Sequence, residues 1–456
     1  MKYLIKDGAI VSSKETVKRD ILIENGKIIK IEEKIKDKDS IIIDAQERYI
    51  FPGFIDTHTH FDLEVSGTTT ADDFSSGTKS AIAGGTTTII DFATQNKGEA
   101  LVEALENWHK KAEGKSSCNY AFHMAISDWN DNTKEQLKDM INEGVTSFKI
   151  YMTYDNMVVN DQEIYEILKE TKKLGALVGV HCENGLLIKE LIKEQKEWGI
   201  NEPIGHSLSR PSIIEAEAVS RLLTIAKLVD SPVMIVHLTS QEALERIEYF
   251  RENGQKVLLE TCPQYLLLDD SLYNREFTEA SKYIISPPLR KLKDQVALWQ
   301  ALRDGEIQTI STDHCSFTLE QKAMGKDDFT KIPNGMPGVQ ERASLIYTYG
   351  VLEKIIPVEK MCELLSESPA KIYGMYPQKG SISVGSDADI VIWNPNVNRL
   401  LADLEHYSQA DYIPFKDFYI EGEAEKVFLN GQLVMENGKI IKENTGVYIK
   451  RKCGIF

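Results

Sequence analysis

Two histidines, His58 and His60, lie two positions apart at the end of an apolar run, in the segment FIDTHTH over residues 54–60. Side chains at positions i and i+2 of a β-strand point to the same face of the sheet. Two imidazoles that leave a strand end on one face can therefore bind one metal ion together. Alone, such a pair is more often two polar residues beside a turn, so the metal interpretation depends on the rest of the chain.

Further residues that can bind a metal close later apolar runs in the same way. Lys149 stands in TSFKIYM, His181 in VGVHCE, His237 in MIVHLT and Asp313 in STDH. Each of them alone could be a hydrogen-bonded core residue or a cap. Their joint occurrence, with four of the nine histidines at such run ends, favours a metal-dependent hydrolase site.

The number of candidate ligands indicates two metal ions rather than one. A catalytic zinc usually takes three protein ligands and a water, and four histidines with one aspartate exceed that set. In two-metal hydrolases the ions lie about 3.5–4 Å apart and polarise the group that is cleaved. Lys149 is cationic as encoded, so in an apolar strand it must be paired, deprotonated or modified. Reaction of its amine with carbon dioxide would give a carbamate, an anion with two oxygens that could bridge two cations.

Eight short apolar runs alternate with helical patterns and would position these residues. Near-continuous apolar runs with helical connections predict the α/β class and a parallel (β/α)8 barrel, whose strand ends converge on one face. An open doubly wound sheet is the alternative, disfavoured because the polar residues end many runs and not one switch point. The expected strands cover residues 54–60, 86–92, 119–126, 146–152, 176–183, 232–239, 256–266 and 307–314.

Both ends of the chain have a different texture from this middle. Short runs rich in Ile and Val, punctuated by Asp-Gly and Asn-Gly dipeptides, fill residues 1–50 and recur after residue 375. Such dipeptides are the strongest short signal for β-hairpins. We therefore expect one small β-domain built from residues 1–50 and 376–456, with a catalytic barrel over residues 51–375 inserted between its halves.

Bulk composition narrows the class of partners. The 456-residue chain carries a formal net charge of -17, which argues against nucleic acid and anionic membranes as partners. Its six cysteines are scattered, with no Cys-x-x-Cys pair, and Met1 leads straight into a strand-like segment instead of a secretion signal. A cytoplasmic location is the resulting expectation.

Beyond these single residues, a set of longer motifs resembles the cyclic amidohydrolases of the hydantoinase/dihydropyrimidinase family over nearly the whole chain. The motifs are PGFIDTHTHFD (52–62), GTTTADDFSSGT (67–78), AGGTTTIIDF (83–92), SFKIYMTY (147–154), GALVGVHCENG (175–185), SPPLR (286–290), STDHCSF (311–317), IPNGMPGVQER (332–342) and HYSQADYIPF (406–415). The resemblance implies a (β/α)8 barrel with a small β-sandwich domain. It also implies two divalent metal ions per subunit, typically zinc.

The resemblance assigns these metals to individual residues. His58 and His60 with Asp313 would hold one ion, and His181 with His237 the other. Lys149 would bridge the two ions as its N6-carboxylated form. All six positions hold the residue type that the family uses.

The resemblance further implies a reaction, the hydrolysis of a cyclic amide in a ureide or imide ring. Asp313 would take a proton from the attacking water and pass it to the leaving nitrogen. Tyr154 resembles the tyrosine that donates to the developing oxyanion. Ser286 and Asn334 match positions whose backbone groups bind the amide edge of the ring. The expected substrates are 5-substituted hydantoins or 5,6-dihydropyrimidines.

Alternatives remain for the substrate and for whether the protein is an enzyme or a scaffold. An allantoinase or dihydroorotase would keep the chemistry on a more polar ring, and a scaffold relative would have lost the ligands that this chain retains. The first substrate loop carries Leu63, Glu64 and Val65 where an aryl-hydantoinase would be expected to have Met-Pro-Phe-like residues. The family usually forms homotetramers, partly through the C-terminal segment, here residues 442–456.

Overall fold

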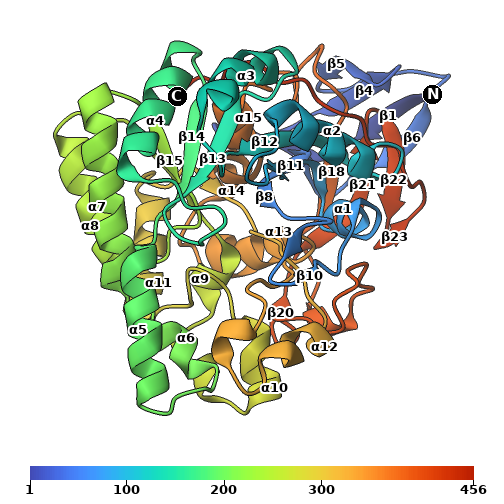
Figure 1. Cartoon of the computed structure of the whole chain (residues 1–456). Helices are drawn as coiled ribbons and strands as arrows, with labels where there is room; N and C mark the ends of the chain where they lie inside the picture. Colours follow the sequence, from blue (N-terminus) through green and yellow to red (C-terminus); the bar gives the residue numbers. More distant parts are fainter.

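An eight-stranded parallel sheet, rolled nearly into a closed barrel, occupies the centre of the computed structural model, which describes residues 1–456 (Figure 1). Between its first and last strands the gap is bridged by the amide of His60, which donates to the carbonyl of His314 at 2.8 Å. The prediction of eight strands in a TIM-like barrel is confirmed. In chain order the strands are β8 (Phe54–Thr59), β11 (Thr86–Thr94), β12 (Asn119–Ala125), β13 (Ser147–Tyr151), β14 (Leu177–His181), β15 (Val233–Ile235), β16 (Val257–Thr261) and β17 (Thr309–Ile310).

Helices connect the strands and surround the barrel, and in Figure 1 α4, α5, α7 and α8 lie along one side of it. Helix ends carry residues that favour them. The side chain of Asn160 caps the N-terminus of α4. Gly175, with φ +67°, follows the last turn of the same helix. The helices are α1 (Phe74–Ala83), α2 (Leu101–Ala112), α3 (Asp131–Asn142), α4 (Asp161–Lys173), α5 (Gly185–Glu197), α6 (Ile204–Leu208), α7 (Ser212–Val229), α8 (Gln241–Glu252), α9 (Pro263–Leu267), α10 (Phe277–Ala280), α11 (Leu292–Arg303), α12 (Leu319–Lys322), α13 (Arg342–Ile346), α14 (Val358–Cys362) and α15 (Ser368–Ile372).

Two further sheets are built from strands near the two ends of the chain. The first has the order β5-β4-β1-β6, and the second, β23-β22-β21-β18-β7-β2-β3, draws strands from both ends of the chain. Their shared core contains Ile5 and Ile23 from the first end and Ile390 and Phe428 from the second. The strands are β1 (Lys2–Lys6), β2 (Ala9–Val11), β3 (Thr16–Lys18), β4 (Asp20–Glu24), β5 (Lys27–Glu32), β6 (Ile41–Asp44), β7 (Tyr49–Pro52), β18 (Ile390–Asn394), β21 (Glu423–Leu429), β22 (Gln432–Glu436) and β23 (Lys439–Ile440). The boundaries at residues 50 and 375 stay a prediction.

Small two-stranded ribbons lie outside these sheets. One is in the loop after β8 and the other is near the second terminal sheet. They are β9 (Glu64–Val65) with β10 (Thr68–Thr69), and β19 (Arg399–Leu400) with β20 (Tyr419–Ile420). The first ribbon places residues of the first substrate loop beside the barrel opening.

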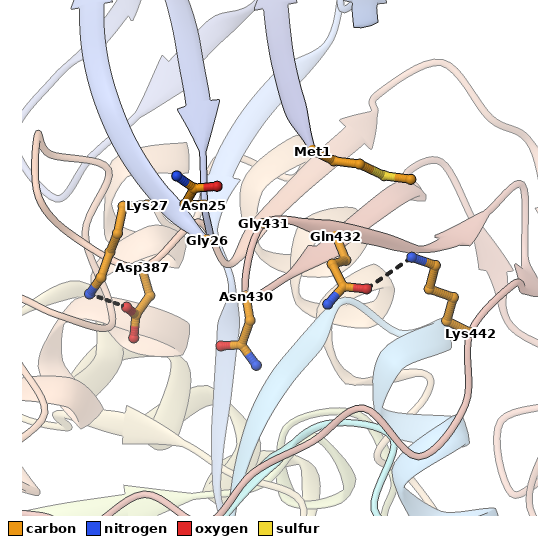
Figure 2. Close-up of a pocket in the computed structure, with 9 residues that line it drawn as sticks. All are labelled: Met1, Asn25, Gly26, Lys27, Asp387, Asn430, Gly431, Gln432 and Lys442. Atoms are coloured by element: carbon orange, nitrogen blue, oxygen red, sulfur yellow. Dashed lines mark hydrogen bonds and ion pairs between the residues drawn. The ribbon is translucent and has the colours of Figure 1, made fainter. Parts of the chain in front are cut away.

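Two Asn-Gly turns join the terminal sheets to each other, as Figure 2 shows. Asn25-Gly26 and Asn430-Gly431 all have positive φ, the conformation that tight hairpins need. The backbone of Ala388 links them, because its amide donates to Gly26 and its carbonyl accepts from Gly431. A Cβ on Gly431 would lie 2.7 Å from the Cα of Gly26, so this contact requires glycine.

The C-terminal tail, residues 444–456, packs against the beginning of strands β12 and β13 of its own barrel. Its backbone exchanges hydrogen bonds with Tyr120 at 3.0 and 2.8 Å. The buried guanidinium of Arg451 donates to Ser147 Oγ at 2.9 Å and to the carbonyl of Phe122. The tail thus closes the barrel end opposite the predicted site.

No helix of the structure is both long enough and apolar enough to span a bilayer.

Candidate active site

A cavity of about 490 Å³ opens at the C-terminal ends of the barrel strands. All nine residues singled out in the sequence line it, which brings together side chains from seven separate segments of the chain. They are His58, His60, Lys149, Tyr154, His181, His237, Ser286, Asp313 and Asn334.

His58, His60 and Asp313 form the tightest group in this cavity. Asp313 Oδ1 lies 3.2 Å from His58 Nε2 and 3.1 Å from His60 Nε2. The three potential ligand atoms lie within 4.8 Å of one another, which fits one divalent metal ion. Burial lowers the pKa of His58 despite the nearby charge of Asp313, so the imidazole is neutral, the form that binds metals.

His181 and His237 pack edge to face beside this group, with ring centroids 4.6 Å apart. His181 Nε2 is held by Glu183 Oε2 at 2.7 Å, which leaves Nδ1 as the nitrogen available to a metal. Two further imidazole nitrogens, Nδ1 of His60 and Nδ1 of His237, are buried without a hydrogen-bond partner. The Nδ1 atoms of His181 and His237 fit a second divalent ion next to the first, whereas His60 belongs to the first group.

Lys149, in the middle of β13, is buried with no carboxylate within 4.0 Å of its Nζ. Two aromatic rings lie near the amine, with Nζ 5.1 Å from the ring centroid of Tyr151 and 5.4 Å from that of Phe92. Burial lowers the pKa of the Lys149 amine to about 8, against the opposite influence of Asp313 and Glu260. An unpaired buried amine with a lowered pKa is suited to reaction with carbon dioxide.

Backbone strain concentrates at this site. Tyr154, His237 and Asp313 have φ values of +68°, +39° and +53°, a region that residues other than glycine rarely adopt. Such conformations persist where the surrounding structure enforces them, and they cluster at functional sites. Here they turn side chains at strand ends and loop starts into the cavity.

The residues expected to contact the substrate come from three loops. Ser286 and Asn334 lie on segments that are joined by a hydrogen bond from the Gly335 amide to the Ile284 carbonyl at 2.9 Å. Tyr154 lies beside His181, with ring centroids 5.3 Å apart. Burial raises the pKa of Tyr154 well above its usual value, so the phenol keeps its proton and can donate it in a hydrogen bond.

Sequence reasoning missed several residues that support the cluster. Glu260 accepts from His58 Nδ1 at 2.7 Å and from the hydroxyls of Thr57 and Ser311. Phe92 stacks on His60, with ring centroids 4.9 Å apart. Glu260 carried a usable signal, because it is a single acid within the apolar run KVLLETC.

Comparisons with known proteins cover nearly the whole chain and agree on one family. The family model described as the amidohydrolase family matches residues 49–434. A D-hydantoinase of Geobacillus stearothermophilus is 43% identical, with 99% of this chain and 97% of the relative covered. A dihydropyrimidinase of Dictyostelium discoideum is 40% identical, with 96% and 88% covered. The crystal structure of dihydropyrimidinase from Brevibacillus agri NCHU1002 superposes with a TM-score of 0.98 at 40% identity, covering 100% of both chains.

Proposed function

The chain belongs to the amidohydrolase family, within which its relatives are hydantoinases and dihydropyrimidinases, and from this premise we propose the reaction that it catalyses. It is a cyclic amidohydrolase that opens the ring of 5-substituted hydantoins or 5,6-dihydropyrimidines to N-carbamoyl amino acids. The observation that carries the proposal is the convergence of the nine residues on one cavity.

Two divalent metal ions, most often zinc in proteins with such ligands, would be held by this cavity. His58, His60 and Asp313 would bind one ion, His181 and His237 the other, and carboxylated Lys149 both. When bound, the metal pair would activate the attacking water and polarise the ring carbonyl.

The remaining steps belong to the protein's own side chains. Asp313, 3.1–3.2 Å from two imidazoles, would accept the proton of the attacking water and return it to the ring nitrogen as the C–N bond breaks. Tyr154 would donate a hydrogen bond to the carbonyl oxygen as charge develops on it. Backbone groups of Ser286 and Asn334 would hold the amide edge of the ring.

The substituent on the ring would face the outer part of the cavity. Leu63, Val65 and Met157 supply apolar surface there, while Glu64 and Lys97 add charge. This mixture supports a polar ring such as allantoin as the second candidate substrate. It favours small or polar substituents over aryl groups.

The test uses protein whose zinc, manganese and cobalt content has been measured. Ring opening is followed with dihydrouracil, hydantoin, 5-phenylhydantoin and allantoin. Turnover with about two metal ions per chain is expected. If the protein binds two ions but opens only allantoin, allantoin replaces hydantoins and dihydropyrimidines as the substrate. If it binds no metal and opens none of the rings, the proposal is contradicted.

Lys149→Ala tests the bridging role. We expect loss of turnover and of the second metal ion, with partial recovery when short carboxylic acids are added. Lys379→Ala is the matched control, because Lys379 is also buried but pairs with Asp387 and Asp389 near the terminal sheets. Full activity of Lys149→Ala without added acid would contradict the carbamate.

We further propose a homotetramer as the assembly, supported by the family resemblance. Light scattering of the full chain measures it directly, and a monomeric mass would contradict it.

A further inference from the structure

Lys322, the last residue of α12, ends in an unusual environment for an ammonium group. Its side chain is fully buried, and Nζ donates to three backbone carbonyls, those of Ile284 at 3.0 Å, Pro333 at 2.7 Å and Gly335 at 2.6 Å. All three N–H donors of the ammonium are therefore used. The three acceptors belong to two segments that are far apart in the sequence.

No carboxylate lies within 4.0 Å of this ammonium, which distinguishes it from the buried ammonium of Lys379, which pairs with Asp387 and Asp389. The ring of Phe317 lies beside the ammonium, with its centroid 5.5 Å from Nζ. Burying an ammonium without a counter-ion is costly. The three carbonyls offset that cost only if their positions around Nζ are fixed.

Fixing these carbonyls also fixes the amides that follow them. A peptide group is planar and trans, so its C=O and N–H point in opposite directions from one rigid unit. The Pro333 carbonyl belongs to the same peptide unit as the Asn334 amide, and the Ile284 carbonyl to the same unit as the Ile285 amide. Lys322 therefore sets the orientation of backbone groups that border Ser286 and Asn334.

Both segments that accept hydrogen bonds from Lys322 reach the active-site cavity. Ile285, Ser286, Asn334 and Gly335 line it. Apart from Lys322, these segments are joined by one backbone hydrogen bond, from Gly335 to Ile284. Gly335 has φ +148° and no room for a Cβ, which would lie 2.3 Å from the Cys315 carbonyl, so this part of the loop sits close against its neighbour.

We propose that Lys322 is a positioning residue for substrate binding. Its ammonium holds segments 284–286 and 333–335 at a fixed spacing, so that the backbone groups of Ser286 and Asn334 meet the amide edge of the ring together. This inference rests on the proposed function, because it takes the ring as the ligand of those groups. Lys322 itself does not touch the substrate.

Lys322→Met removes the donors and keeps most of the side-chain volume. The amide edge is bound alike in the ground and transition states, so its loss raises KM and leaves kcat nearly unchanged. We expect KM for the best ring substrate to rise about tenfold or more, kcat to change less than about threefold, and the metal content to stay the same. An unchanged KM would overturn the inference.

Lys379→Met is the matched control, since it also removes a buried ammonium but one remote from the cavity. We expect it to lower the thermal midpoint without changing KM. Should Lys322→Met fail to fold, Lys322→Gln retains two N–H donors and is expected to give an intermediate KM. A wild-type KM for the folded Gln variant with a lowered thermal midpoint would mean that Lys322 serves stability alone.

Hydrogen exchange of the substrate-free protein separates this inference from the proposed function. Peptides that cover residues 284–290 and 332–338 should exchange faster in Lys322→Met than in wild type and in Lys379→Met. If wild type and control turn over none of the four rings, the proposed function fails. The exchange rates then still show whether Lys322 holds the two segments together. Unchanged exchange in both segments would overturn it.

Discussion

Glu260 is the residue on which the geometry of His58 depends most directly. Its carboxylate accepts from His58 Nδ1 at 2.7 Å and so directs Nε2 towards Asp313. In other proteins, mutation of a carboxylate that orients a metal-binding histidine weakens metal binding by roughly 10–100-fold. Glu260→Gln should therefore weaken metal binding by about 10–100-fold, measured by competition with a chelator.

Glu215 provides the control for that prediction. It is buried like Glu260, but it accepts from Thr239 and lies 3.5 Å from Arg290 instead of a candidate metal ligand. Glu215→Gln should leave metal affinity within about twofold of wild type. Equal losses in both variants would assign the effect of Glu260 to general destabilisation.

Tyr154 is expected to contact the substrate and to act chiefly on the rate. Burial raises the pKa of its phenol, so the hydroxyl stays a donor across the working pH range. Removing one donor to a developing oxyanion costs about 10²–10³-fold in kcat. Tyr154→Phe should lose about that much kcat with metal content unchanged, and wild-type kcat would exclude this role.

At the scale of elements, the loop over residues 401–415 is fastened to the barrel through His406. Its Nδ1 lies 3.2 Å from Glu341 Oε1, and its Nε2 contacts the Leu401 carbonyl at 2.9 Å. Burial alone would lower the pKa of His406, but the hydrogen bond and charge of Glu341 outweigh it and raise the pKa. A raised pKa in the folded state means that protonated His406 stabilises the fold.

The sign of the pH dependence follows from that shift. The stabilisation is fully present below the unfolded pKa of about 6.5 and is lost as pH rises through the higher folded pKa. Wild type should exceed His406→Asn by about 1 kcal/mol in free energy of unfolding at pH 6, with the gap narrowing above pH 7. Urea unfolding from pH 5.5 to 8.5 measures it, and a gap that widens with pH would contradict the assignment.

Elements whose signal is local were predictable from the sequence. Each barrel strand is a short apolar run, and the side chains that close the runs, such as His181 and Asp313, define the cavity. Lys322 could not be found in this way, because it follows Glu320 and Gln321 in a polar stretch that resembles solvated surface. Its burial comes from segments 284–286 and 333–335, which only the tertiary fold brings around it.

At the scale of the whole molecule, the C-terminal tail completes the barrel. Arg451 is buried and donates to Ser147 and Phe122, whereas its neighbour Lys450 is exposed and pairs with Glu143. Arg451→Met leaves buried acceptors without donors and should cost about 1–3 kcal/mol of stability. Lys450→Met, at an exposed ion pair, should cost about 0–1 kcal/mol.

Thermal unfolding of these two variants measures the difference. Light scattering of a chain shortened to residue 441 measures the mass of the assembly without the C-terminal segment. Equal stabilities would mean that the tail does not support the barrel. A lowered thermal midpoint with unchanged mass would make the tail an intramolecular closure and count against its predicted part in oligomerisation.

The pairing of β7 with β18 also sets the order in which the protein can be completed during synthesis. Residues 49–52 leave the ribosome early, but their partners at 390–393 follow more than 300 residues later. At about 5–20 residues per second this delay is roughly 15–70 s. During that interval the barrel strands emerge while the β7 edge of the second terminal sheet remains unpaired. The barrel end that the C-terminal tail covers stays open until the last residues are released. The nascent chain therefore exposes apolar surface for most of its synthesis, so we expect protection by chaperones to matter more for this protein than for one whose sheets are completed early.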